Sequence, residues 1–226
     1  PWIERCRSHA AKDTSGAARS TGTLPVNHLL VVGEDGLCGA LGVKLVKECM
    51  SGWQVRHPAI DCKGVTNLVN SLARYCEQAA RVQPIVCVAD SDGKCPIELI
   101  DTWLPKRKPK RLILRLAVTE AESWLLADHE GFSAAFEVTA SALPRHPDEV
   151  GDPKATLLKV ARRSRIRGVR EEVVSQFDHN RRGTGYNQHL RAFVEKRWSA
   201  RRAAERSPSL ARAIRRLGSW SSSLAA

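Results

Sequence analysis

The chain has 226 residues, of which 42% are hydrophobic, so it is long enough to bury a sizeable core. No stretch is apolar for long enough to span a bilayer, and we expect no membrane contact. The seven cysteines stand singly, without a C-x-x-C pair, which argues against a disulfide framework and a zinc knuckle. Unpaired cysteines fit a reducing compartment, so we expect a cytoplasmic protein.

The net charge of +12 is unevenly distributed along the chain. Residues 1–150 carry 18 basic and 18 acidic side chains, which cancel, whereas residues 151–226 carry 18 and 6. The excess of positive charge therefore belongs to the C-terminal third, and this predicts binding of a polyanion, most often a nucleic acid. The alternative is a solvated, arginine-rich helical surface.

Apolar runs alternate with helical patterns through the first part of the chain. Residues 1–24 are polar and are expected to form a flexible lead-in. Residues 106–111 form a basic loop. Strands are expected at 25–32, 53–60, 85–88 and 112–118, and helices at 37–50, 66–80, 96–104 and 123–128, with Thr66 as an N-cap. The alternation predicts an α/β domain over residues 25–143, with a mostly parallel sheet flanked by helices.

Residues 144–226 are expected to form a basic helical region, with helices at 155–169, 188–198 and 209–217. Side chains of the types that bind phosphate or contact bases are found in this region. The candidate nucleic-acid-binding residues are Lys154, Arg162, Arg163, Arg165, Arg182, Tyr186 and Asn187. The alternative for residues 181–187 is a glycine turn with Tyr186 packed on the core.

Three of the expected strands end in acidic residues: Glu34 with Asp35, Asp90 with Asp92, and Glu120 with Glu122. Parallel strands bring these ends to the same edge of a sheet, which is where ligands bind in open α/β folds. Carboxylates that lie so close together repel one another unless a cation neutralises them. We therefore expect a Mg²⁺ or Mn²⁺ site whose ligands come from Glu34, Asp90, Asp92, Glu120 and Glu122.

Local roles in helix formation are the alternative explanation for some of these acidic residues. Thr119 and Glu122 have the spacing of a capping box for the helix that follows. Glu34 and Asp35 can stabilise the N-terminus of the next helix through its dipole. Asp90 and Asp92 are least affected by these helix roles, and the alternative for them is an Asp-rich turn that ends the strand for backbone reasons.

With these residues in place, the sequence resembles the TOPRIM fold, in which a Glu ends the first strand and a D-x-D turn ends a later one. Most of the chain, from about Leu29 to Leu217, is similar to an uncharacterised bacterial family of TOPRIM-like proteins. The matching segments are V-x-E-D at 32–35, V-A-D-S-D at 88–92, A-V-T-E-A-E-S-W-L-L-A-D at 117–128, D-P-K at 152–154, G-Y-N at 185–187 and S-P-S-L at 207–210.

The resemblance implies a Mg²⁺-dependent phosphodiester enzyme, since TOPRIM relatives include topoisomerases, primases and defence nucleases that act with ATPase partners. It implies metal binding by Asp90 and Asp92, and for Glu34 a role as metal ligand or general acid/base. The chain departs from the usual Glu-Gly after the first strand, because Gly33-Glu34-Asp35-Gly36 stands there. No topoisomerase-like Tyr and no primase module is evident, which favours a nuclease.

Three functional hypotheses follow. The first is a metal-dependent nuclease with Glu34, Asp90 and Asp92 as catalytic residues, acting in antiviral defence or as a toxin. The second is a non-catalytic nucleic-acid-binding or assembly subunit, in which the basic region carries the function. The third is a receiver-like phosphoacceptor, with Asp90 as the phosphorylated residue.

Overall fold

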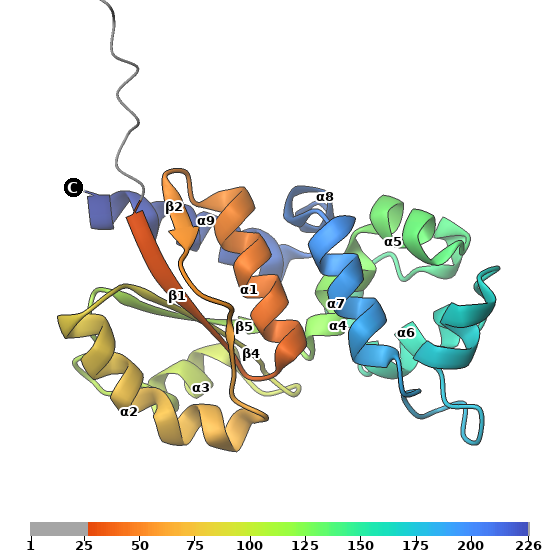
Figure 1. Ribbon diagram of the computed structural model, residues 1–226, viewed down its shortest axis with the longest axis horizontal. Coiled ribbons are helices and arrows are strands. Elements are labelled where there is room, and N and C mark those ends of the chain that lie inside the picture. The colour runs from red at the N-terminus through yellow and green to blue at the C-terminus, as the bar shows by residue number, and fades with distance from the viewer. Residues whose placement is uncertain (1–26, 226) are drawn as a thin grey trace, which may run out of the picture.

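A parallel sheet forms the centre of the computed structural model, which describes residues 27–225 (Figure 1). The strands are β1 (Asn27–Gly33), β2 (Trp53–Val55), β3 (Ile60–Asp61), β4 (Ile85–Asp90) and β5 (Leu112–Ala117). Their order is β2-β1-β4-β5, with β3 also paired to β1, and every pair is parallel. The predicted α/β class with a parallel sheet flanked by helices is confirmed. The expected lead-in, residues 1–24, lies outside the described residues.

The strand predicted over 53–60 is two short strands, β2 and β3, on the same side of β1. β2 pairs with the first half of β1, from Asn27 to Leu29, and β3 pairs with its end at Val32 and Gly33. Pro58 lies in the interruption. Proline has no backbone N–H to donate to a neighbouring strand, so the prediction of one continuous strand was wrong.

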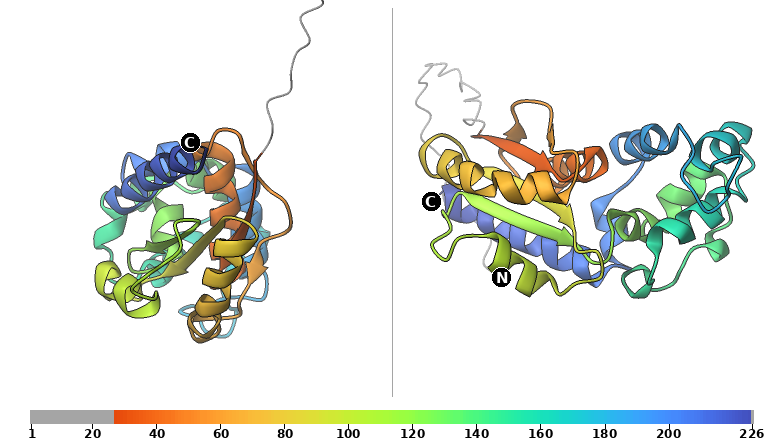
Figure 2. Two further views of the ribbon diagram at one scale, coloured as in Figure 1. Left: turned by 90° about the vertical axis from the view of Figure 1, so that its left-hand side faces the viewer. Right: turned by 90° about the horizontal axis from the view of Figure 1, so that it is seen from below.

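Helices cover both faces of the sheet (Figures 1 and 2). One face packs against α1 (Gly36–Cys49) and α9 (Pro208–Ala225), and the other against α2 (Val65–Arg81) and α3 (Pro96–Trp103). β4 is therefore buried on both sides, which explains its continuous apolar sequence. The N-cap position of α2 is Gly64, without a side-chain cap, so the prediction of Thr66 as the cap was wrong.

A second group of helices, here called the helical lobe (residues 121–204), lies beyond the carboxyl edge of the sheet (Figure 1). It contains α4 (Ala121–Ala127), α5 (His129–Phe136), α6 (Pro153–Ala161), α7 (Tyr186–Lys196) and α8 (Ala200–Ala204), with short turns η1 (Ala140–Ala142), η2 (Pro147–Glu149) and η3 (Val169–Val173). Helices α5 and α8 were not anticipated from the sequence. No helix in residues 27–225 is both long and apolar enough to cross a membrane.

The hydrophobic core continues from the sheet into the helical lobe. Trp124 and Trp198 are both almost fully buried. The indole nitrogen of Trp198 donates to the Trp124 carbonyl at 2.9 Å, and that of Trp124 donates to the Ser209 hydroxyl at 2.9 Å. These bonds satisfy the polar atoms of two large buried rings. They fix α4, the segment between α7 and α8, and α9 to one another across the boundary expected near residue 144.

The helix predicted over 155–169 ends earlier, because α6 stops at Ala161. The chain turns at Ser164, whose hydroxyl donates to the Phe136 carbonyl and accepts from the N–H of Ile166. A serine side chain that bonds to nearby backbone competes with helix formation. The last helix is instead longer than predicted, since α9 continues to Ala225.

Candidate functional site

Glu34 and Asp90 lie at the ends of the two central strands. Glu34 follows β1 and Asp90 ends β4, and one oxygen of Glu34 accepts a hydrogen bond from the backbone N–H of Asp90 at 3.0 Å. The chain leaves β1 toward β2 and leaves β4 toward β5, in opposite directions along the sheet. The crevice at such a reversal is where ligands bind in open α/β sheets.

Close packing of α1 against the end of β1 positions Glu34. A Cβ atom at Gly33 would overlap the backbone nitrogen of Gly39 and the carbonyl oxygen of Asp35, so only glycine fits here. The Asp35 carboxylate accepts from the N–H groups of Leu37 at 2.9 Å and Cys38 at 2.8 Å, and thereby caps α1. Asp35 therefore caps α1, as in the alternative that gave this residue a role at the helix N-terminus.

The side chain of Asp90 points toward the start of α4. Its Oδ1 atom accepts from the N–H of Ala121 at 2.8 Å and lies 3.6 Å from the Cys38 sulfur. Burial, and then the charges of Glu122, Glu34 and Asp35, raise the pKa of Asp90 to about 8. The site thus has more negative charge than its own contacts neutralise.

Glu122 is not part of a capping box. Glu120 occupies the N-cap position of α4 without a side-chain cap bond, and Thr119 has a positive φ of 63°. Glu122 is 3% exposed and accepts a hydrogen bond of 2.7 Å from the buried hydroxyl of Tyr186. Burial is the largest influence on the pKa of Glu122 and raises it above the usual range.

Lys154 supplies a positive charge to this group of carboxylates. Its ammonium binds Glu120 at 2.7 Å and lies 4.0 Å from Glu122, and its backbone N–H donates to Glu120 at 3.0 Å. Both oxygens of Glu120 are therefore engaged by Lys154. We call Glu34, Asp90, Glu120 and Glu122 the acidic cluster. The Lys154 ammonium is thus bound to the acidic cluster, and its contact with nucleic acid stays a prediction.

Asp92 is placed differently from Asp90. It is exposed, in a turn with a φ of 47°, and its N–H donates to the Thr119 carbonyl at 2.8 Å. The strand has ended at Asp90, so the alternation that would aim both side chains the same way no longer applies. The charge of Asp92 nevertheless raises the pKa of Glu34, after the larger effect of burial. Asp92 therefore lies near Glu34 at the mouth of the site.

The five predicted metal ligands do not form one ligand set. Among residues 27–225, no three or more His, Cys, Asp or Glu side chains are arranged to hold a metal ion. Glu120 is bound to Lys154 and Glu122 to Tyr186. Glu34 and Asp90 offer oxygen donors, which suit Mg²⁺, and this ion commonly uses one or two carboxylates and completes its shell with water and phosphate. In donor chemistry these two residues fit such an ion.

A cavity of about 590 Å³ opens beside the acidic cluster, between α1 and α7. Asp35 and Gly36 line its end nearest the cluster, and Lys44, Lys63 and Arg191 line its sides. Its lining also includes Asp35, Asp61 and Glu195, and Lys63 is paired with Asp61, so the cavity has no clear preference for an anionic group.

The predicted nucleic-acid-binding residues of the lobe divide into exposed and buried groups. Tyr186 is 2% exposed, so its ring is not available to stack on a base, and the alternative of a tyrosine packed on the core describes it. The Arg182 guanidinium lies over this ring, 5.7 Å from its centre. The exposed candidates are Arg162, Arg163, Arg165, Arg182 and Asn187.

Phe177 was not identified from the sequence. It is fully exposed, at 103%, in a loop closed by a bridge between Val174 and Arg182. The base of this loop adjoins Tyr186 and therefore the acidic cluster. The only sequence signal was its position between polar and basic residues, Ser175-Gln176 and Asp178 to Arg182.

Comparison of the chain with protein-family models, with curated proteins and with solved structures finds no significant match.

Proposed function

We propose that the chain is a metal-dependent nuclease that hydrolyses phosphodiester bonds at the carboxyl edge of its sheet. The observation that carries the proposal is the position of Glu34 and Asp90. The Glu34 carboxylate accepts a hydrogen bond from the backbone N–H of Asp90 where the strand order reverses, and the Asp90 side chain is buried near further carboxylates. Such an arrangement is unfavourable without a cation and becomes favourable with one.

Glu34 and Asp90 would hold the metal, and Mg²⁺ or Mn²⁺ would supply Lewis-acid activation of a water and of the phosphate oxygens. Burial raises the pKa of Glu34 above its ordinary value, which favours the alternative role of this residue as a general acid or base. The Lys154 ammonium, close to Glu120 and Glu122, can balance charge that develops on the phosphate. Asp92 is exposed close to Glu34 and would be available to bind water near the metal.

The exposed arginines of the helical lobe are suited to hold the phosphate backbone. Arg162, Arg163 and Arg165 follow α6, and Arg182 stands on the ring of Tyr186 next to the acidic cluster. Contacts of this kind position a strand without reading its sequence. The free state of the six cysteines between Cys38 and Cys95 is in keeping with a cytoplasmic location.

A cleavage assay with Mg²⁺ or Mn²⁺ and single- and double-stranded DNA and RNA tests the proposal. We expect Asp90→Asn to lower the cleavage rate by at least about 100-fold, since even the outer partners of metal ligands are worth about 10- to 100-fold. Asp101→Asn, which removes an exposed carboxylate from α3, is the matched control and should retain full activity. Equal cleavage by the two variants, or no cleavage by the wild-type chain, would contradict the proposal.

Phe177 is expected to contact the substrate strand. Base–aromatic stacking is worth about 1–3 kcal/mol for each base, so Phe177→Ala should weaken binding of a single-stranded oligonucleotide by roughly 5- to 100-fold. Its thermal midpoint should not change, because the side chain is fully exposed. Ile97→Ala, at an exposed apolar residue on α3, serves as the control in fluorescence-anisotropy titrations. An equal loss of oligonucleotide affinity in Phe177→Ala and Ile97→Ala would rule out a specific contact at Phe177.

The second candidate function is a non-catalytic nucleic-acid-binding subunit. It is favoured by the ion pair of Lys154 with Glu120, which already neutralises part of the acidic cluster. Under this alternative, Asp90→Asn retains nucleic-acid binding and the associated function, whereas combined alanine replacements of Arg162, Arg163 and Arg165 abolish both.

A further inference from the structure

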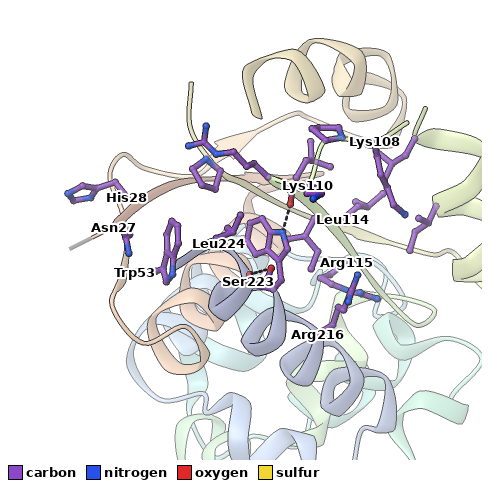
Figure 3. A pocket seen from close by; sticks show the side chains of 18 residues that line it. Asn27, His28, Trp53, Lys108, Lys110, Leu114, Arg115, Arg216, Ser223 and Leu224 are labelled. Atoms are coloured by element: carbon purple, nitrogen blue, oxygen red, sulfur yellow. Dashed lines mark hydrogen bonds between the residues drawn. The ribbon is translucent and has the colours of Figure 1, made fainter. Parts of the chain in front are cut away.

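A second, larger cavity lies at the opposite edge of the sheet from the acidic cluster. It measures about 930 Å³ and extends along the outer side of β5, between α3 and α9 (Figure 3). The 18 residues that line it include no aspartate or glutamate. Its basic residues are Lys108, Lys110, Arg111, Arg115 and Arg216, so the basic loop noted in the sequence forms part of its wall.

Arg115 is the unusual residue of this cavity. It lies in the middle of β5, where its neighbours on the same face, Ile113 and Ala117, belong to the hydrophobic core. Its Nε atom is buried and has no hydrogen-bond partner in the described part of the chain. A buried N–H without a partner is destabilising, and such groups are rare in folded proteins.

Further positive charge surrounds Arg115. Arg216 lines the same cavity, and Figure 3 shows its side chain extending from α9 toward that of Arg115. The charges of Arg216 and Arg212 add to the effect of burial and lower the pKa of Arg115. Within residues 27–225, no carboxylate lies within 4.0 Å of the guanidinium of Arg115, Arg212 or Arg216. Among the described residues, the cavity therefore has no negative charge to balance its arginines.

The geometry points to a phosphate group as the missing partner: we propose that this cavity binds the phosphate of a nucleotide-sized ligand. Guanidinium groups bind phosphate oxygens through paired, charge-assisted hydrogen bonds. Trp53 and Trp220 also line the cavity, and as buried members of the hydrophobic core they form part of its apolar wall. The volume lies at the upper end of the range for small-molecule sites and accommodates a mononucleotide.

Two sources can supply a nucleotide phosphate here, a free nucleotide or the 5′-phosphorylated end of a nucleic-acid strand. We favour these two sources over a duplex backbone, because the cavity lies between β5 and α9 and the Nε atom of Arg115 is buried. Either ligand would bind far from the acidic cluster, so its binding would not depend on cleavage at that cluster.

Isothermal titration calorimetry in the presence of EDTA tests this site without any contribution from metal-dependent chemistry. We expect adenosine 5′-monophosphate to bind the wild-type chain and adenosine not to bind. Arg216→Ala and Arg115→Leu should each weaken binding by about 10-fold or more, the effect of one charge-assisted hydrogen bond. Arg215→Ala is the matched control, because Arg215 is the exposed neighbour of Arg216 and does not line the cavity.

A pair of oligonucleotides that differ only in a 5′-phosphate or 5′-hydroxyl end identifies the source. Binding of the phosphorylated oligonucleotide in competition with the mononucleotide supports a strand end, and binding of the mononucleotide alone supports a free nucleotide. If neither phosphorylated probe binds the wild-type chain, or if Arg215→Ala loses as much affinity as Arg216→Ala, the proposal is wrong. Retained cleavage activity in Arg216→Ala would separate this outcome from a failure of the nuclease proposal.

Discussion

Replacing Asp90 with asparagine will stabilise the folded chain, and the gain will grow as the pH rises from 3.8 to about 8. The pKa of Asp90 is raised from 3.8 to about 8, first by burial and then by the charges of Glu122 and Glu34. Between these values the folded chain binds more protons than the unfolded chain. The contribution of Asp90 to stability is therefore full below pH 3.8 and is lost as the pH rises through about 8.

Asparagine removes this loss because it does not titrate, while its carbonyl oxygen can still accept from the N–H of Ala121. We expect the free energy of unfolding of the wild-type chain to fall by up to about 1.4 kcal/mol for each pH unit relative to Asp90→Asn. Urea unfolding between pH 4 and pH 8.5 measures the difference. Asp101→Asn, an exposed carboxylate on α3, should follow the wild-type curve.

Binding of Mg²⁺ should offset the loss of stability that the ionised Asp90 causes. A ligand that binds only the folded chain raises its stability by mass action. At pH 8 we therefore expect Mg²⁺ to raise the thermal midpoint of the wild-type chain and to leave that of Asp90→Asn unchanged. Identical pH curves for the wild-type chain and Asp90→Asn would show that Asp90 is not a destabilising carboxylate, and an equal response to Mg²⁺ would place any metal site elsewhere.

Asp128→Ala is expected to destabilise the chain by roughly 2–5 kcal/mol, because each buried donor left without its acceptor costs about 1–3 kcal/mol. The Asp128 side chain is fully buried and binds Arg202 through two bonds, of 2.7 and 2.8 Å. It also accepts from the N–H groups of Gly131 at 3.1 Å and Ser199 at 2.8 Å. Alanine leaves two backbone donors without their partner, at the junction of α4, α5 and α8, and leaves the Arg202 guanidinium with the Arg197 carbonyl and Glu130.

Urea unfolding at pH 7 measures this effect as a lower midpoint with an unchanged slope. Arg167→Ala is the control, because it removes an ion pair with Glu171 that is exposed to solvent and should leave the midpoint unchanged. A similar midpoint for the two variants would mean that the Asp128 network does not hold the helical lobe together.

Local patterns determined the sheet and the approximate position of the site. The strands from Leu29 to Val32 and from Ile85 to Ala89 are apolar without alternation because helices cover both faces, and this can be read from the sequence. Parallel pairing then requires the residues that follow β1 and β4 to meet, so the proximity of Glu34 and Asp90 was predictable. The break between β2 and β3 at Pro58 could also have been predicted from the sequence.

Only the tertiary structure decided which side chains the site leaves free. Glu120 and Glu122 are bound by Lys154 and Tyr186, which follow them by 34 and 64 positions. Arg115 meets Arg216 because α9 returns to β5 after the whole helical lobe has formed. No local periodicity encodes contacts at such separations, since they depend on how packed helices cross. The sequence by itself therefore determined a parallel sheet with acidic strand ends, and the packing of the lobe determined the role open to each acid and each arginine.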